Sequence, residues 1–264
     1  MKTIENIFFE GERPLFAANH LQLNHVKFYP GHSALKEACN IRATNCEFYG
    51  KYPFWHNTNS VIENSLFTAY ARAAIWYCKD IQMLNTRVEA PKMFRKIDGL
   101  YLENVELSDA QECMWWCKNI RLNKVKVKNG VYIFKDSKNI KIADLNLQGN
   151  YGFQYARNVE IRNSHIQSKD AFWNTENVTV YDSVIEGEYL GWHSKNLRLG
   201  NCTIGGSQPL CYARNLVMKN CRMKENAHLA FEYSTLNAEI NSAVTSIKNP
   251  SEGEIFAHRI GDYF

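Results

Sequence analysis

Five ionisable side chains have types and spacing that suit acid–base chemistry: Lys92, Arg95, Glu112, Asp136 and Asp170. A lyase can use a Lys or Arg as its base while a neighbouring cation holds a substrate carboxylate. A glycoside hydrolase instead needs two carboxyl groups about 5 to 9.5 Å apart. In the repeat described below, Glu112 and Asp170 are separated by three coils, or about 14 Å, so Glu112 and Asp136 form the better-spaced acidic pair. An ion pair between Lys92 and Glu112, which occupy one position in adjacent coils, is the alternative to catalysis.

Aromatic side chains recur beside these charges. One column of the repeat reads Trp55, Trp76, Arg95, Trp115, Lys135, Gln154, Trp173 and Trp192. Strand alternation predicts that this column faces solvent, and five exposed tryptophans are more than a soluble surface usually carries without a partner. We therefore expect a substrate-binding platform made of Trp55, Trp76, Trp115, Trp173, Trp192, Tyr151 and Tyr189. Loops or a partner subunit that cover the rings, or a bulge that turns them inward, are the alternatives.

A repeat of 19 to 21 residues positions all of these side chains. Segments that begin at Asn119, Asn139, Asn158, Asn177, Asn196 and Asn215 share the pattern Asn, apolar, any, apolar, followed by further alternation. Twelve such starts can be placed along the chain, and a period of this length indicates a solenoid. The sequence predicts an all-β protein, a right-handed parallel β-helix of about 12 coils with three parallel sheets. We expect a single domain over residues 1–264, with regular coils over 1–235 and an irregular last coil and C-terminal cap over 236–264.

Polar ladders mark the bends of this solenoid. Asn residues begin many of the coils, and a second series of Asn and Asp residues lies five positions later, as at Asn45, Asn104 and Asn201. Asn tolerates the left-handed backbone of a sharp bend, and amides stacked coil over coil can hydrogen-bond to one another. A ladder that recurs on most coils marks no single site, so we expect these residues to be structural.

Composition limits the classes of partner and cofactor. Lys and Arg number 31 against 27 Asp and Glu, without basic clusters, which gives no support to a nucleic-acid or membrane partner. The N-terminal segment has no apolar stretch suited to a signal peptide or membrane span, so a cytoplasmic location is expected. The eight cysteines should then be reduced, with Cys46, Cys202 and Cys221 pointing inward. No pattern for a metal or other cofactor is found.

The segments SKDAFWN and GEYLGWHSKNL, together with AIWYCKD, APKMFR, AQECMWW and FEYSTLNAEINS, resemble an uncharacterised bacterial family of unknown function. The resemblance extends over nearly the whole chain. It implies a pectin-lyase-like right-handed β-helix and brings no established activity, so no catalytic residue follows from it. Many proteins with this fold are polysaccharide lyases or glycoside hydrolases, but the paired-Asp and calcium-binding signatures of those enzymes are absent here.

Two hypotheses follow from these observations. In the first, the protein binds or cleaves an oligosaccharide along an aromatic groove on the third strand of each coil. In the second, the protein is a non-catalytic scaffold whose aromatic face contacts another protein or a second copy in a homo-oligomer. Solvent access to the tryptophan column distinguishes a groove from a covered interface.

Overall fold

A computed structural model describes all residues from Met1 to Phe264. The chain forms two compact units, Met1–Ile133 and Phe134–Phe264, and both consist of strands without any helix. The first unit contains β1 (Lys2–Glu5), β2 (Phe8–Glu12), β3 (Asn19–Asn24), β4 (Lys27–His32), β5 (Cys39–Thr44), β6 (Glu47–Phe48), β7 (Thr58–Glu63), β8 (Leu66–Phe67), β9 (Lys79–Leu84), β10 (Arg87–Val88), β11 (Asp98–Glu103), β12 (Glu106–Leu107) and β13 (Lys118–Val131). The second contains β14 (Lys138–Asn150), β15 (Arg157–Arg162), β16 (His165–Lys169), β17 (Glu176–Tyr181), β18 (Val184–Glu186), β19 (Lys195–Gly200), β20 (Thr203–Gly205), β21 (Leu216–Met223), β22 (Thr235–Ile247) and β23 (Glu252–Tyr263).

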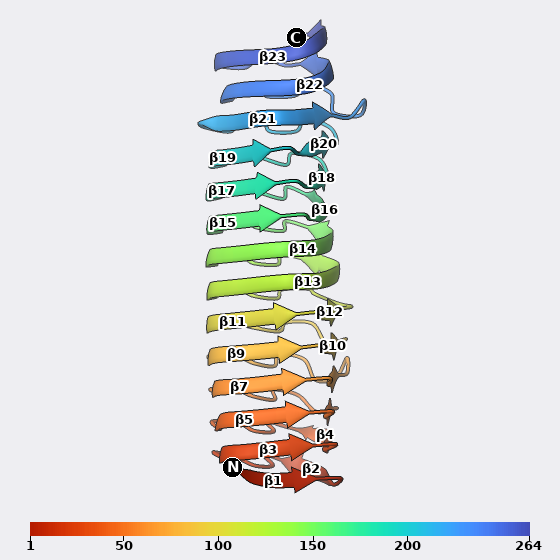
Figure 1. The fold of residues 1–264 in the computed structure, drawn as a ribbon, viewed down its shortest axis with the longest axis vertical. Coiled ribbons are helices and arrows are strands. Elements are labelled where there is room, and N and C mark those ends of the chain that lie inside the picture. The colour runs from red at the N-terminus through yellow and green to blue at the C-terminus, as the bar shows by residue number, and fades with distance from the viewer. The chain divides into compact units, whose positions relative to one another are not determined.

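Each unit is a parallel β-solenoid, as the period predicts. In the first unit β1, β3, β5, β7, β9, β11 and β13 pair in that order, every pair parallel. In the second unit β14, β15, β17, β19, β21, β22 and β23 do the same. Within each unit the coils wind right-handed as the chain proceeds (Figure 1).

The coil count is seven per unit, or fourteen, and the expected count of twelve was too low. The two additional coils are those of β22 and β23, which lie in the segment expected to be irregular. Leu236 pairs with Leu216 before it and with Gly253 after it, so the spacing changes from 20 to 17 residues. Register shifts accompany both pairings, and the resulting loss of period conceals these strands in the sequence.

The polar ladders form as expected. The Asn196 side chain donates to Asn177 Oδ1 at 2.8 Å and accepts from Asn215 at 3.1 Å. In the second ladder, the Asn201 amide donates to Asp182 Oδ1 at 2.8 Å. The backbone φ of Asn196 is 57° and that of Asn201 is 53°, the left-handed conformation that Asn tolerates.

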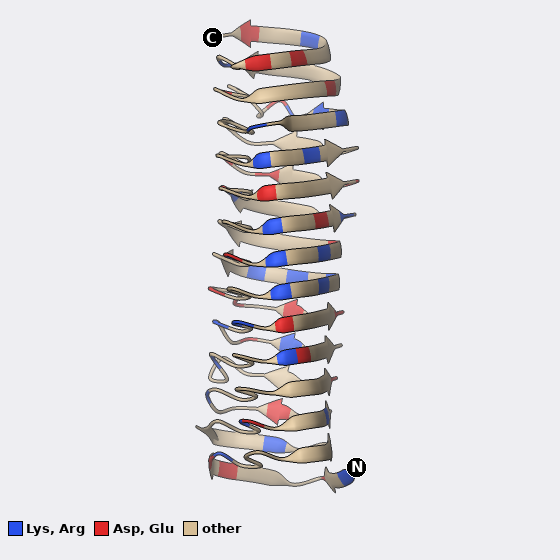
Figure 2. Cartoon of the chain, turned by 90° about the vertical axis from the view of Figure 1, so that its left-hand side faces the viewer, with Lys and Arg blue, Asp and Glu red and all other residues tan.

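The third side of each coil is a run of turns in place of an extended strand. In the coil that precedes β7, φ is positive at Tyr52, Phe54 and His56, with values of 62°, 57° and 56°. Bonds from residue i+3 to residue i close such turns, as from Ser137 N to Phe134 O at 3.1 Å. Two adjacent positions therefore point outward after each buried aromatic, where simple alternation predicts one. Figure 2 shows these turns as the loops at the left of the view.

The core is apolar and runs through the middle of each unit. The aromatic residue that precedes the two outward positions of the third side is buried, as at Phe54 and Phe94 in the first unit and Phe153 and Phe172 in the second. All eight cysteines are free thiols, and Cys46, Cys202 and Cys221 are buried as predicted. Burial raises the pKa of the Cys46 thiol to about 11 and that of Cys202 to about 12. No helix is both long and apolar enough to cross a membrane.

Candidate functional site

The tryptophans of the first unit form a column stacked along the solenoid, here called the inner column: Trp55, Trp76, Arg95 and Trp115. The rings of Trp55 and Trp76 stack with centroids 5.2 Å apart and planes 12° from parallel. The Arg95 guanidinium lies between the next two rings, 4.5 Å from the centre of Trp76 and 4.4 Å from that of Trp115. Neighbours in the column therefore cover both flat faces of Trp76 and one face each of Trp55 and Trp115.

Backbone hydrogen bonds hold the inner column in place. Trp55 Nε1 donates to Ala73 O at 2.5 Å, and Trp76 Nε1 donates to Lys92 O at 2.7 Å, in both cases one coil further on. Trp115 Nε1 donates to Tyr132 O in the same way. All three tryptophans are half-buried. The column faces outward as predicted, but its geometry is that of a structural stack, because a sugar ring stacks on an open aromatic face.

The charged residues predicted beside this column come together. Glu112 Oε1 lies 3.3 Å from Lys92 Nζ, and Glu112 Oε2 lies 2.5 Å from Arg95 Nη2. The expected ion pair of Lys92 and Glu112 is therefore present, and Arg95 adds a stronger contact. The Arg95 side chain is only 15% exposed, so this carboxylate compensates a cation held between two rings. Both oxygens of Glu112 therefore contact cations, so Glu112 is a poor general base.

A second column lies beside the inner one and is more exposed. This outer column comprises His56, Tyr77, Lys96 and Trp116. His56 and Tyr77 stack at 5.0 Å, and Lys96 Nζ lies 5.4 Å from the Tyr77 ring and 6.0 Å from the Trp116 ring. Tyr77 is 41% exposed and Trp116 is 46% exposed. The sequence places these residues next to the tryptophans, but period-2 alternation gave no reason to prefer them as contacts.

The second unit has a shorter aromatic column. Trp173 and Trp192 stack with centroids 5.7 Å apart. Tyr151 and Tyr189 each pack against one of these rings, at 6.0 Å from Trp173 and 5.7 Å from Trp192 respectively. Gln154 precedes Trp173 in the column and is buried. Unlike the bonded indoles of the first unit, Trp192 Nε1 is buried without a hydrogen-bond partner, as is Gln154 Oε1.

Asp170 is the most perturbed carboxyl group in the second unit. Its side chain is 2% exposed, and Oδ1 has no hydrogen-bond partner. Burial raises the pKa of Asp170 to about 6, and the nearby Glu188 carboxylate adds to this rise while Lys169 opposes it. Glu188 is exposed and paired with Lys169 at 3.6 Å, and sequence reasoning did not select it. A carboxyl group in this state keeps its proton up to about pH 6, well above the range of an ordinary Asp.

The remaining acidic candidate is not part of either cluster. Asp136 lies at an exposed position of the second unit. The acidic pair of Glu112 and Asp136 joins residues of different units and stays a prediction. Within the two units no group of three or more His, Cys, Asp and Glu side chains is arranged to hold a metal ion.

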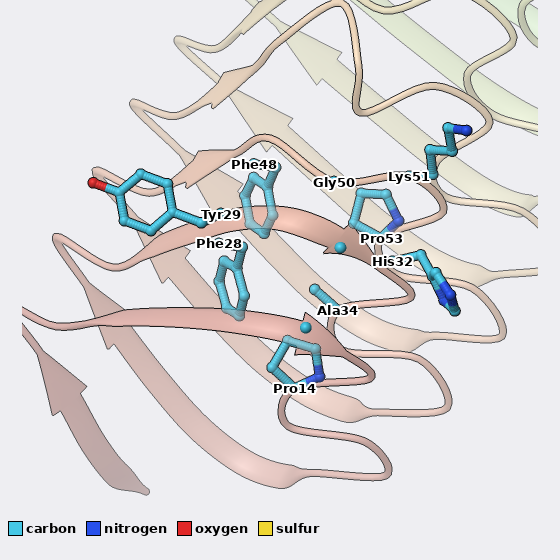
Figure 3. Close-up of a pocket in the computed structure, with 11 residues that line it drawn as sticks. Pro14, Phe28, Tyr29, His32, Ala34, Phe48, Gly50, Lys51 and Pro53 are labelled. Carbon is cyan, nitrogen blue, oxygen red and sulfur yellow. The ribbon is translucent and has the colours of Figure 1, made fainter.

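A small recess in the first unit is lined by other residues than those of the two columns (Figure 3). Pro14, Phe28, Phe48 and Pro53 are among the residues that line it, and its volume is about 10 Å³, close to that of a single water molecule. The glycines Gly11, Gly31 and Gly50 stack along one wall, where a Cβ at Gly31 would lie 2.1 Å from Gly11 O. At the rim, His32 Nε2 lies 3.1 Å from Glu12 Oε1. The recess is too small for an organic ligand.

Comparisons with solved structures find β-helical proteins at low identity. The surface adhesin PfbA of Streptococcus pneumoniae is 11% identical, with a TM-score of 0.49 over 96% of this chain and 83% of that one. The A-module of the mannuronan C-5 epimerase AlgE4 of Azotobacter vinelandii is 10% identical, with a TM-score of 0.36 over 98% and 86% of the two chains. The catalytic domain of a GH87 α-1,3-glucanase in complex with nigerose is 8% identical, with a TM-score of 0.41 over 99% and 63%. Identities in this range transfer no activity to this chain.

A search of proteins of curated function finds no match. The resemblance to a family of unknown function is confirmed, because a family model described as "Protein of unknown function (DUF3737)" matches residues 2–264. The match includes both units and every candidate site residue. The chain belongs to this family, DUF3737.

Proposed function

We propose that the protein binds an acidic oligosaccharide on the third side of the first unit, without cleaving it. The proposed surface, here called the basic aromatic face, consists of residues 51–56, 72–77, 92–96 and 111–116. The observation that carries the proposal is the outer column, in which Lys96 lies between the exposed rings of Tyr77 and Trp116. A cation beside two partly exposed aromatic rings suits a ligand with both carboxylates and apolar ring surfaces.

The charge of this face supports an acidic ligand. Its four segments contain five basic residues and one acidic residue, which are Lys51, Arg72, Lys92, Arg95, Lys96 and Glu112. Glu112 is bound to two of these cations, while the other three basic residues are exposed. Blue segments on the loops of the first unit show this bias (Figure 2). An excess of positive charge on one face attracts anions even though the whole chain is nearly neutral.

The repeat makes this face suitable for a chain-like ligand. Successive coils present their third-side residues about 4.8 Å apart, so contacts recur along the face. An oligosaccharide of acidic sugars also repeats its carboxylates along its length. The inner column holds the outer column in position. The hydrogen bonds from the indoles of Trp55, Trp76 and Trp115 to backbone carbonyls fix the backbone that carries the exposed side chains.

The proposal is tested by measuring binding of uronic-acid oligosaccharides and of neutral oligosaccharides of equal length by titration calorimetry. We expect binding of the acidic series only, weakening as salt rises because exposed charges are screened. Lys96→Gln and Trp116→Ala should each weaken binding about tenfold, the effect of losing about 1.4 kcal/mol. Tyr70→Ala is the matched control, since Tyr70 is a 74% exposed aromatic residue outside the face. Absence of binding to any acidic oligosaccharide would refute the proposal.

A protein partner is the second candidate for the same face. The recess described in the first unit is lined by other residues than Tyr77, Lys96 and Trp116. A face that exposes Tyr and Trp side chains is also typical of protein interfaces. Suppose that the wild-type protein does not bind acidic oligosaccharides and that Trp116→Ala lowers the molar mass measured by light scattering. The face would then be a contact surface for another protein molecule.

A further inference from the structure

The first strands of the first unit and the last strand of the second unit carry unpaired edges. At the start, β1 pairs only with β3, and β2 pairs only with β4. At the finish, β23 pairs only with β22. We call β1 and β2 the head edge, and β23 the tail edge. Each leaves a row of backbone N–H and C=O groups available to another strand.

The apolar core is open at both edges. Ile7 occupies in the first coil the position that Val26 occupies in the second, and it is 44% exposed while Val26 is 0% exposed. At the tail edge, Ile260 pairs with Val244 and Tyr263 pairs with Ile247. Ile260 is 42% exposed and Tyr263 is 65% exposed, although their partners Val244 and Ile247 are each only 1% exposed. Core positions at each end thus lack the next coil.

Exposed apolar residues concentrate at these same edges. Every exposed Met, Ile or Phe of the chain lies in residues 1–16 or 256–264, namely Met1, Ile7, Phe8, Phe16, Phe256, Ile260 and Phe264. The other large exposed residues are Tyr or Trp, which carry a polar group. The sides of the coils therefore expose large apolar groups only as Tyr or Trp, whereas the two edges also expose Met, Ile and Phe. Such a concentration marks an interaction surface.

We propose that the tail edge of one copy binds the head edge of a second copy, so that molecules associate head to tail. A second copy fits because the two edges have similar lengths and each edge strand pairs in parallel with its own neighbour. β23 extends from Glu252 to Tyr263, and the head edge extends from Lys2 to Glu12. The tail edge offers the head edge what each coil offers the next, a parallel ladder above an apolar column.

This contact joins two different surfaces, so it is not a two-fold contact. A two-fold dimer would place identical edges together and bury only one kind of edge. The head-to-tail contact buries both and leaves one free head and one free tail on every open assembly. Association should therefore increase continuously with concentration instead of stopping at a dimer.

The test uses two charge substitutions that block opposite edges, Ile7→Lys at the head and Ile260→Lys at the tail. Wild-type protein should form oligomers whose mass rises with concentration in sedimentation velocity, and each variant alone should be monomeric. An equimolar mixture of the two variants should give a one-to-one complex, because the intact tail of Ile7→Lys meets the intact head of Ile260→Lys. Tyr70→Lys is the control and should associate like wild type, and circular dichroism should show unchanged strand content in all variants.

Two results would overturn the proposal. Wild-type protein that stays monomeric over the whole concentration range would show that the edges do not associate. A variant that still dimerises alone, while the mixture forms no additional complex, would show that identical edges pair. Because exposed positions are changed, loss of association without loss of strand content cannot be attributed to unfolding.

Discussion

Replacing Asp170 by Asn should stabilise the protein above pH 6. The Asp170 carboxyl is 2% exposed, and one of its oxygens has no hydrogen-bond partner. Burial raises its pKa from the ordinary 3.8 to about 6, and a rise of this size corresponds to about 3 kcal/mol between the two protonation states. At neutral pH the Asp170 carboxylate therefore has a higher free energy in the folded protein than in the unfolded chain, which lowers the stability of the fold.

The sign of the pH dependence follows from this rise in pKa. Below about pH 4 the carboxyl is protonated in both states, and it contributes no penalty. Between about pH 4 and pH 6 the unfolded chain ionises first, so the free energy of unfolding falls as pH rises. Above about pH 6 the penalty is complete. Asn is neutral at every pH and should remove this fall, with a gain of about 2 kcal/mol at pH 8 after about 1 kcal/mol is allowed for an unpaired buried amide.

The assay is urea unfolding followed by circular dichroism at pH 4.5 and pH 8, for wild type, Asp170→Asn and Asp136→Asn. Asp136 is an exposed carboxylate in the same unit, so its replacement should change stability little at either pH. Asp170→Asn should unfold at higher urea than wild type at pH 8 and close to wild type at pH 4.5. If Asp170→Asn is less stable than wild type at pH 8, the ionised carboxylate has a favourable partner and the burial argument is wrong.

Two further predictions concern the first unit. Arg95→Met should lower the free energy of unfolding by about 3 kcal/mol, because it removes the cation between two rings and leaves Glu112 with one fewer partner. Urea unfolding measures this change. A decrease below about 0.5 kcal/mol would show that Arg95 does not stabilise the column. In the native protein, only Cys39 should react with a thiol reagent, since the other seven cysteines are buried and burial raises the pKa of thiols such as Cys113 to about 12. Rapid modification of two or more thiols before unfolding would contradict this assignment.

The sequence predicts the solenoid because its period is repeated in local chemistry. Each copy places apolar residues inward and an Asn at a left-handed bend, and both features are visible without a structure. The hydrogen bonds from Asn196 to Asn177 and from Asn215 to Asn196 confirm this interpretation directly. The last two coils escaped prediction because β22 and β23 keep the fold while losing the period, although Asn241 of β22 still donates to Asn220 of the second ladder.

The candidate site was only partly predictable. The contact of Lys92 with Glu112 follows from register alone, because two residues at one position of adjacent coils are neighbours. The role of the tryptophans does not follow from register, since it depends on the backbone of the third side. With positive φ at alternate residues, that side turns two adjacent positions outward, so Trp76 stacks within the column while Tyr77 projects beyond it. Burial of Asp170 depends on the packing of its neighbours, which no sequence pattern records.

The two outward positions on the third side have different roles, because one stabilises the coil and the other is free to contact a ligand. A ring that stacks on its neighbours and donates its N–H to the backbone, as Trp76 does, stabilises the coil but has no free face for a ligand. A ring one position later, such as Trp116, gains little from the coil and stays 46% exposed. If both positions served the same purpose, Trp76→Phe and Trp116→Ala would change stability and ligand affinity in the same proportion. We expect them to separate, with Trp76→Phe lowering stability because it leaves the Lys92 carbonyl without its donor, and Trp116→Ala acting on affinity alone.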